Sequence, residues 1–80
     1  MKRADAYTRI SAILSADFQV PAERVVEDAH LRADLGLDSL ALTDLAFLLQ
    51  SDFGFKSEPD EFRGVATVGA LVDFVADHAP

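Results

Sequence analysis

The sequence predicts an all-α fold, a small four-helix bundle with a long first loop and a short third helix. Two segments repeat their apolar residues at the i, i+3, i+4 and i+7 spacing of one helix face, a third has apolar residues at helical spacing, and no segment shows convincing strand alternation. Each of these segments also begins or ends at residues that cap or break helices. The length of 80 residues predicts a single domain, residues 1–80.

The first helix is predicted over Asp5 to Asp17, where apolar residues recur at helical spacing and polar residues take the other side. Pro21 then breaks the pattern, and residues 19–36 show no sustained period. A structureless connection of that length is unusual in so small a domain. We therefore expect this long first loop to pack on the core through its scattered apolar residues. These are Val20, Val25, Val26, Leu31 and Leu35.

The second helix has the clearest boundaries. Asp38 can accept backbone N–H bonds as its N-cap, and Gly36 eases the turn before it. From Ser39 to about Asp52 there is neither glycine nor proline, and leucine and alanine dominate. Gly54 is expected to end the helix.

Two apolar stripes run along this second helix. The first has the spacing of a core-facing side and comprises Leu42, Leu45, Ala46, Leu49 and Phe53. The second lies on a different side, is interrupted by Asp44, and comprises Leu40, Phe47 and Leu48. A helix in a globular domain needs only one such stripe. The second is either buried by another helix or is an exposed contact surface beside Ser39.

The C-terminal third of the chain predicts one short and one longer helix. Residues 58–64 read as a loop with one helical turn. Thr67 is then a suitable N-cap for a final helix. Its core-facing residues are Val68, Leu71, Val72 and Val75.

The composition narrows the classes of partner. Fourteen acidic and seven basic residues give a formal charge of −7 and a pI near 4.4, which disfavours nucleic acid and anionic lipid and favours basic protein partners. The same acidity can also serve only to keep a small domain soluble.

The N-terminus lacks an apolar signal core, and no apolar run approaches the roughly 20 residues of a membrane span. We expect a cytoplasmic monomer with no stable membrane insertion.

The residues predict no enzyme and no metal site. Ser39 lacks the Gly-x-Ser-x-Gly context of a nucleophile elbow, and the candidate bases His30 and His78 stand in no recognisable arrangement. Asp34 and Asp38 lack the ligand ladder of a calcium loop, and two lone histidines make no zinc site. With no cysteine, the chain also has no thiol nucleophile. Both histidines are expected to be ordinary surface residues.

Ser39 nevertheless occupies a distinctive position, in the opening turn of the best-defined helix. Unpaired backbone N–H groups and the positive end of the helix dipole face outward there. An anionic phosphodiester attached to this serine would be well placed. A serine there can equally be a helix-cap residue, and local chemistry leaves both readings open.

The stretch Asp34-Leu35-Gly36-Leu37-Asp38-Ser39-Leu40 resembles the attachment motif of acyl carrier proteins, in which the serine carries 4'-phosphopantetheine. Other landmarks of that family follow in order, so that the resemblance covers roughly residues 7–76. They are Val25, Ala29 and Leu31 before the motif, and Phe53-Gly54-Phe55, Pro59 and Ala66-Thr67-Val68 after it. The chain is identified as a member of the acyl carrier family.

The resemblance implies a four-helix bundle of acyl-carrier type and a carrier mechanism. A carrier-protein synthase would transfer phosphopantetheine from coenzyme A to Ser39, with magnesium. Acyl groups would then be held as thioesters and presented to acyl-loading and acyl-transfer enzymes of fatty-acid, polyketide or related lipid biosynthesis. The implied partner contacts are Asp38, Leu40, Asp44 and Phe47. The implied acyl pocket involves Leu42, Leu49, Phe53, Val65 and Leu71.

Departures from the family pattern favour a specialised carrier over a housekeeping one. The second helix holds only Asp44 and Asp52, where the family is usually rich in acids, and Ser57 replaces a usual apolar residue. Two alternatives to an acyl carrier remain open. Carriers of aminoacyl or peptidyl groups more often show Gly-Gly before the Ser-Leu pair, so Gly36-Leu37-Asp38 favours the acyl type. The other is a carrier-like interaction module that is never modified.

Overall fold

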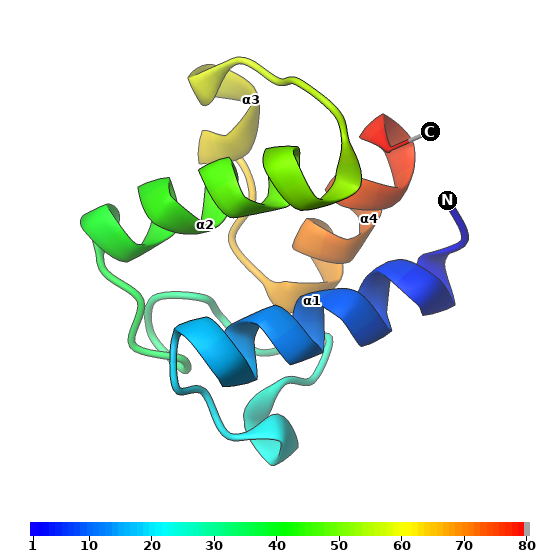
Figure 1. The fold of residues 1–80 in the computed structure, drawn as a ribbon. Coiled ribbons are helices and arrows are strands. Elements are labelled where there is room, and N and C mark those ends of the chain that lie inside the picture. Colours follow the sequence, from blue (N-terminus) through cyan, green and yellow to red (C-terminus); the bar gives the residue numbers. More distant parts are fainter. Residues whose placement is uncertain (80) are drawn as a thin grey trace.

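A computed structural model of the chain describes residues 1–79, and the C-terminal Pro80 of the predicted domain lies outside them. Over that range the prediction of an all-α bundle with a short third helix is confirmed (Figure 1). The only backbone bridge of strand type in this range joins His30 to Thr67. The elements are α1 (Arg3–Asp17), the 3-10 turn η1 (Ala22–Arg24), α2 (Ser39–Phe53), α3 (Pro59–Arg63) and α4 (Val68–His78).

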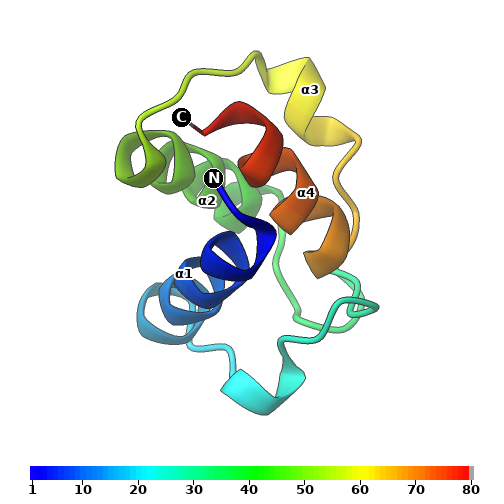
Figure 2. The same ribbon diagram turned by 90° about the vertical axis from the view of Figure 1, so that its right-hand side faces the viewer.

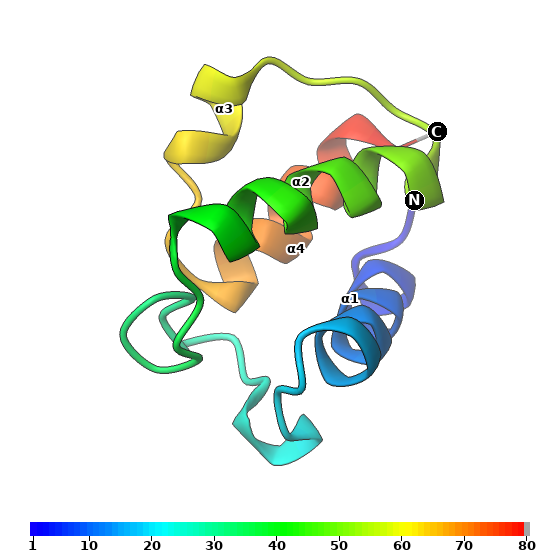
Figure 3. The ribbon, with the colours of Figure 1, turned by 60° about the vertical axis from the view of Figure 1, so that its left-hand side comes forward.

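The core lies among the three longer helices. α1 packs against α4, and α2 crosses both, while α3 lies on the far side of this group from α1 (Figures 2 and 3). The innermost side chains come from all three helices and include Ile10, Leu14, Leu45, Leu49 and Leu71. Among residues 1–79, none of the helices combines the length and apolar character that crossing a membrane requires.

Helix α1 begins at Arg3, two residues earlier than predicted. The Arg3 guanidinium donates hydrogen bonds to the carboxylates of Glu27 and Asp73 and to the carbonyl of Gly69, the last at 3.2 Å. These contacts join the start of α1 to the first loop and to α4. The extension therefore depends on tertiary contacts that apolar periodicity does not detect.

The long first loop packs on the core as expected, with one exception. Val20, Val25 and Leu31 are buried and Leu35 is half-buried, but the prediction for Val26 was wrong, because its side chain is 50% exposed. Val25 takes the inward position of this adjacent pair, and its carbonyl accepts a hydrogen bond from the Tyr7 hydroxyl of α1. The neighbouring side chain is thereby turned outward.

The predicted caps are present at both major helices that follow the loop. The Asp38 carboxylate accepts the backbone N–H of Ala41 at 2.8 Å, and the Thr67 hydroxyl accepts that of Ala70 at 3.1 Å. Gly54 ends α2 in the left-handed conformation, with φ of 72°. Local sequence chemistry therefore defines where α2 begins and ends, and with it the position of Ser39.

Candidate functional site

Ser39 is presented to solvent at the first turn of α2. Gly36, with φ of 73°, bends the chain just before the helix, a conformation that glycine adopts without strain. Asp38 supplies the cap through its own side chain. The hydroxyl of Ser39 makes no hydrogen bond within residues 1–79, and only its backbone carbonyl is engaged, by the Thr43 hydroxyl at 2.9 Å. Capping therefore does not occupy the serine.

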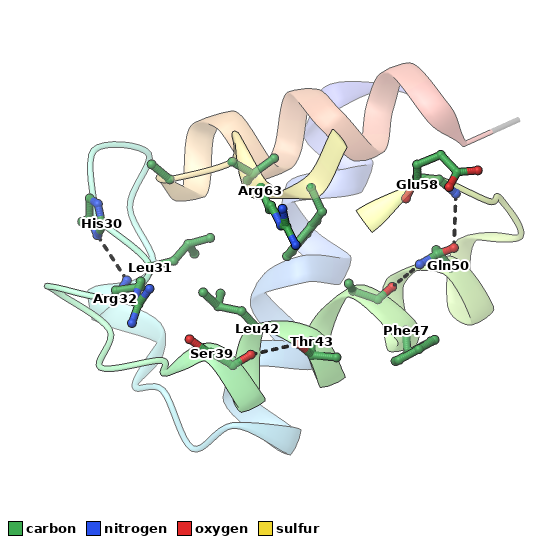
Figure 4. Close-up of a pocket in the computed structure, with 15 residues that line it drawn as sticks. His30, Leu31, Arg32, Ser39, Leu42, Thr43, Phe47, Gln50, Glu58 and Arg63 are labelled. Atoms are coloured by element: carbon green, nitrogen blue, oxygen red, sulfur yellow. Dashed lines mark hydrogen bonds between the residues drawn. The ribbon is translucent and has the colours of Figure 1, made fainter. Parts of the chain in front are cut away.

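A hollow of about 860 Å³ opens beside Ser39, between α2, α3 and the loops that precede α2 and α4 (Figure 4). Its volume falls within the range typical of small-molecule sites. Ser39 lies at one end and Gln50 toward the other. The apolar part of the wall comprises Leu31, Leu42, Ala46, Phe47, Phe62, Val65 and Ala66.

The predicted acyl-pocket residues divide into two groups. Leu42 and Val65 line the hollow, whereas Leu49, Phe53 and Leu71 do not. Those three are buried in the closed core, with exposures of 1%, 5% and 0%. A chain lying in the hollow would touch the first group only. A pocket role for the second group stays a prediction, and it would require the core to open.

The polar end of the hollow is built around Gln50. Its side-chain amide donates to the Ala46 carbonyl at 3.2 Å, and its side-chain oxygen accepts the backbone N–H of Ser57 at 3.2 Å. The connection from α2 to α3 is thereby tied to α2. Sequence reasoning missed this role, although Leu42, Ala46 and Gln50 form an i, i+4, i+8 row, which shares one side of a helix.

The second apolar stripe of α2 is not buried by another helix. Leu40 is 71% exposed and Phe47 68%, Leu48 is 39% exposed, and Asp44 between them also faces solvent. The stripe is therefore exposed, and its role as a contact surface stays a prediction. Phe47 and Leu48 also border a shallow depression whose other wall includes Phe18, at the end of α1.

One of the two acidic residues of α2 is already engaged in an ion pair. The Asp52 carboxylate pairs with the Arg9 guanidinium at 2.9 Å, and that guanidinium lies 4.3 Å from the ring centroid of Phe53. Asp38 and Asp44 form no ion pair within the described range. They are the two carboxylates beside the exposed stripe that remain available to an external cation.

His30 holds the loop before α2 in shape. Its Nδ1 accepts the backbone N–H groups of Arg32 and Ala33, at 3.2 and 3.1 Å, and the backbone N–H of His30 donates to the Asp34 carboxylate at 2.7 Å. The ring also lines the hollow that contains Ser39. Because Nδ1 is committed to the backbone, this histidine has a structural role that its expected surface character did not anticipate.

His78 joins α3 to α4. Its ring stacks on Phe74, with centroids 4.2 Å apart, while Nδ1 lies 2.8 Å from the Phe74 carbonyl and Nε2 lies 2.9 Å from the Glu61 carboxylate. The bond to the Phe74 carbonyl, and then the Glu61 carboxylate, raise the pKa of His78 above its ordinary 6.5. Among residues 1–79 there is no group of three metal-binding side chains.

Comparisons with known proteins agree with this geometry. Residues 8–75 match the family described as "Phosphopantetheine attachment site". The chain is 36% identical over 77 residues to the acyl carrier protein of Saccharopolyspora erythraea, covering 96% of this chain and 81% of that protein. It is 37% identical over 75 residues to acyl carrier protein 2 of Ralstonia nicotianae, covering 94% and 93% of the two chains.

The solved structure of the acyl carrier protein from Enterococcus faecalis superposes with a TM-score of 0.81 at 25% identity, over 99% of this chain and 100% of that one. Fold, family match and relatives therefore agree over nearly the whole described chain. The chain belongs to the acyl carrier protein family, and it is a non-catalytic carrier of acyl groups on a phosphopantetheine arm.

Proposed function

We propose that Ser39 is the residue to which phosphopantetheine is attached. The observation that carries this proposal is the geometry at the start of α2. The Asp38 side chain caps the helix, so the Ser39 hydroxyl is exposed and has no hydrogen-bond partner in residues 1–79. The surroundings fit the group, because backbone N–H groups of the first helical turn stabilise a phosphodiester. When bound, the group supplies the thiol that the chain lacks, on which acyl groups are held as thioesters.

The attachment is tested by intact-mass measurement. The unmodified chain is incubated with coenzyme A, magnesium and a broad-specificity carrier-protein synthase, alongside the variants Ser39→Ala and Ser57→Ala. Ser57 is the matched control, because it is a second serine lining the same hollow. We expect the wild type and Ser57→Ala to gain the mass of one phosphopantetheine group and Ser39→Ala to gain none. Modification of Ser39→Ala would contradict the proposal.

We further propose that acyl groups on the arm rest in the hollow between α2 and α3. Leu42, Ala46 and Val65 offer apolar surface there, and Phe62 of α3 supports the opposite wall. Burial of each methylene of an acyl chain on such a surface contributes roughly 0.8 kcal/mol. Leu49, Phe53 and Leu71 would become part of the pocket only for a chain that enters the core.

Partner enzymes are proposed to dock on the exposed face of α2. Family membership implies a phosphopantetheinyl transferase and acyl-handling enzymes as partners. We assign the contact to the exposed side chains next to Ser39. These are Asp38, Leu40, Asp44 and Phe47.

The chemistry of this face supports a specialised carrier, and we propose that this carrier acts as a cytoplasmic monomer. Asp52 is occupied by Arg9, so that only Asp44 remains as a free acid along α2 itself. Apolar contact by Leu40 and Phe47 therefore outweighs charge in the docking surface. Association with a dedicated partner should depend only weakly on salt, because few long-range charges steer the encounter.

A further inference from the structure

The loop before α2 holds Arg32 in a fixed place. The ring of His30 accepts the backbone N–H of Arg32, and the backbone N–H of Leu31 donates to the carbonyl of Ala66 at 2.9 Å. The backbone at Arg32 is thus held by the His30 ring, and the backbone at Leu31 is held by the segment before α4. An exposed arginine on so constrained a loop loses less backbone freedom when it binds a ligand than one on a free loop does.

Arg32 and Ser39 line the same hollow, and Figure 4 shows them at the same end of it. Arg32 differs in its pairing from several other arginines. Arg3 and Arg9 form ion pairs with carboxylates, and Arg63, on the α3 side of the hollow, pairs with Asp60 at 3.3 Å. Arg32 forms no ion pair within the described chain. In a domain of formal charge −7, it is a cation left available beside the exposed serine.

We propose that Arg32 binds the phosphodiester that links the arm to Ser39, and so holds the root of the arm over the hollow. This rests on the proposed attachment at Ser39. The phosphodiester places a permanent negative charge next to the carboxylate of Asp38, and like charges this close repel each other. A guanidinium offers paired N–H donors that match phosphate oxygens. Arg32 is a positioning residue in this account, and a partner enzyme that extends the arm must release it.

The test compares the effect of attaching the arm in chains with and without this guanidinium. The thermal midpoint of unfolding is measured for the unmodified and modified forms of the wild type, Arg32→Gln and Arg24→Gln. Arg24 is the matched control, because it is an exposed arginine of η1 that does not line the hollow. We expect the rise in midpoint on modification to be about 2–5 °C smaller in Arg32→Gln than in the wild type and in Arg24→Gln.

Two further measurements distinguish an ionic contact of Arg32 from a general effect of the substitution on folding. The difference should fall away in about 1 M salt, where the Debye length is about 3 Å, and should be largely retained by Arg32→Lys. The ³¹P resonance of the modified chain should shift in Arg32→Gln and not in Arg24→Gln. Equal midpoint changes in all variants that mass measurement shows to be modified would overturn the role of Arg32. Failure of the wild type to be modified at Ser39 would instead overturn the proposed attachment.

Discussion

Two neighbouring side chains at the start of α2 have separate tasks. The Asp38 carboxylate accepts the N–H of Ala41, so that the helix is capped without Ser39. Helix capping and the proposed attachment of the arm therefore do not compete for the serine hydroxyl. This separation makes the two residues independently testable.

Replacing Asp38 should reveal which of its two proposed roles depends on charge. Asp38→Ala removes the cap and should lower the free energy of unfolding by about 1 kcal/mol, whereas Asp38→Asn keeps a capping oxygen and should change it little. Urea unfolding of the unmodified chains measures this difference. If Asp38 also contacts the synthase through its charge, Asp38→Asn will fold like the wild type but be modified more slowly. An asparagine variant as unstable as the alanine variant would contradict the capping account.

At the scale of the helix, α2 has three sides with different surroundings, whereas apolar periodicity indicated two. Leu45 and Leu49 face the core and Leu40 and Phe47 are largely exposed, while Leu42 is half-buried and lines the hollow beside Ser39, whose edge Phe47 also reaches. The caps and the presence of a second apolar stripe could be predicted, because both depend on residues close in sequence, whereas the exposure of that stripe could not. The hollow could not, since Leu42 shares the apolar spacing of the core stripe. Its partial exposure depends on how far α3 lies from α2.

The same limit applies to the residues that shape the loops. The contact of Gln50 with Ser57 ties α2 to the connection after it, and the contact of His30 with the backbone of Arg32 shapes one loop. Both use polar side chains that carry no periodic signal. The extension of α1 to Arg3 likewise depends on acids that are distant in sequence. Local capping and apolar spacing therefore predict the helices, while polar tertiary contacts shape the site.

The exposed and buried sides of α2 should respond differently to truncation. Phe47→Ala should leave the free energy of unfolding within about 0.5 kcal/mol of the wild type, because the ring is largely exposed. It should still lower kcat/KM of a partner enzyme that uses the modified chain. Leu45→Ala, in contrast, removes a fully buried side chain and should cost about 2–5 kcal/mol. Full transfer activity with Phe47→Ala would exclude that ring from the docking surface.

For the molecule as a whole, the position of α3 governs the hollow. α3 is held to α4 by the contact of Glu61 with His78 and by the edge-to-face rings of Phe62 and Phe74, whose centroids lie 5.8 Å apart. Phe62 also lines the hollow. Weakening the attachment of α3 should therefore alter the wall of the site as well as the stability of the domain.

The pH dependence of stability should report on this attachment. Because the pKa of His78 is raised above 6.5 in the folded chain, the protonated ring contributes stability that is fully present below pH 6.5. That contribution is lost as the pH rises through the raised value. It should be below about 1 kcal/mol, since the ring and Glu61 are partly exposed. Urea midpoints measured across this pH range should fall in the wild type and stay nearly flat in His78→Gln. If the urea midpoint of His78→Gln changed with pH as it does in the wild type, a group other than His78 would be responsible for the pH dependence.

The central claim is that this acidic bundle carries acyl groups through Ser39. The most direct measurement is tandem mass spectrometry of the chain isolated from its native cell, with the modification located by peptide fragmentation. The account predicts phosphopantetheine, in part acylated, on the peptide that contains Ser39. A chain that carries no such group, or carries it on another residue, would contradict the account.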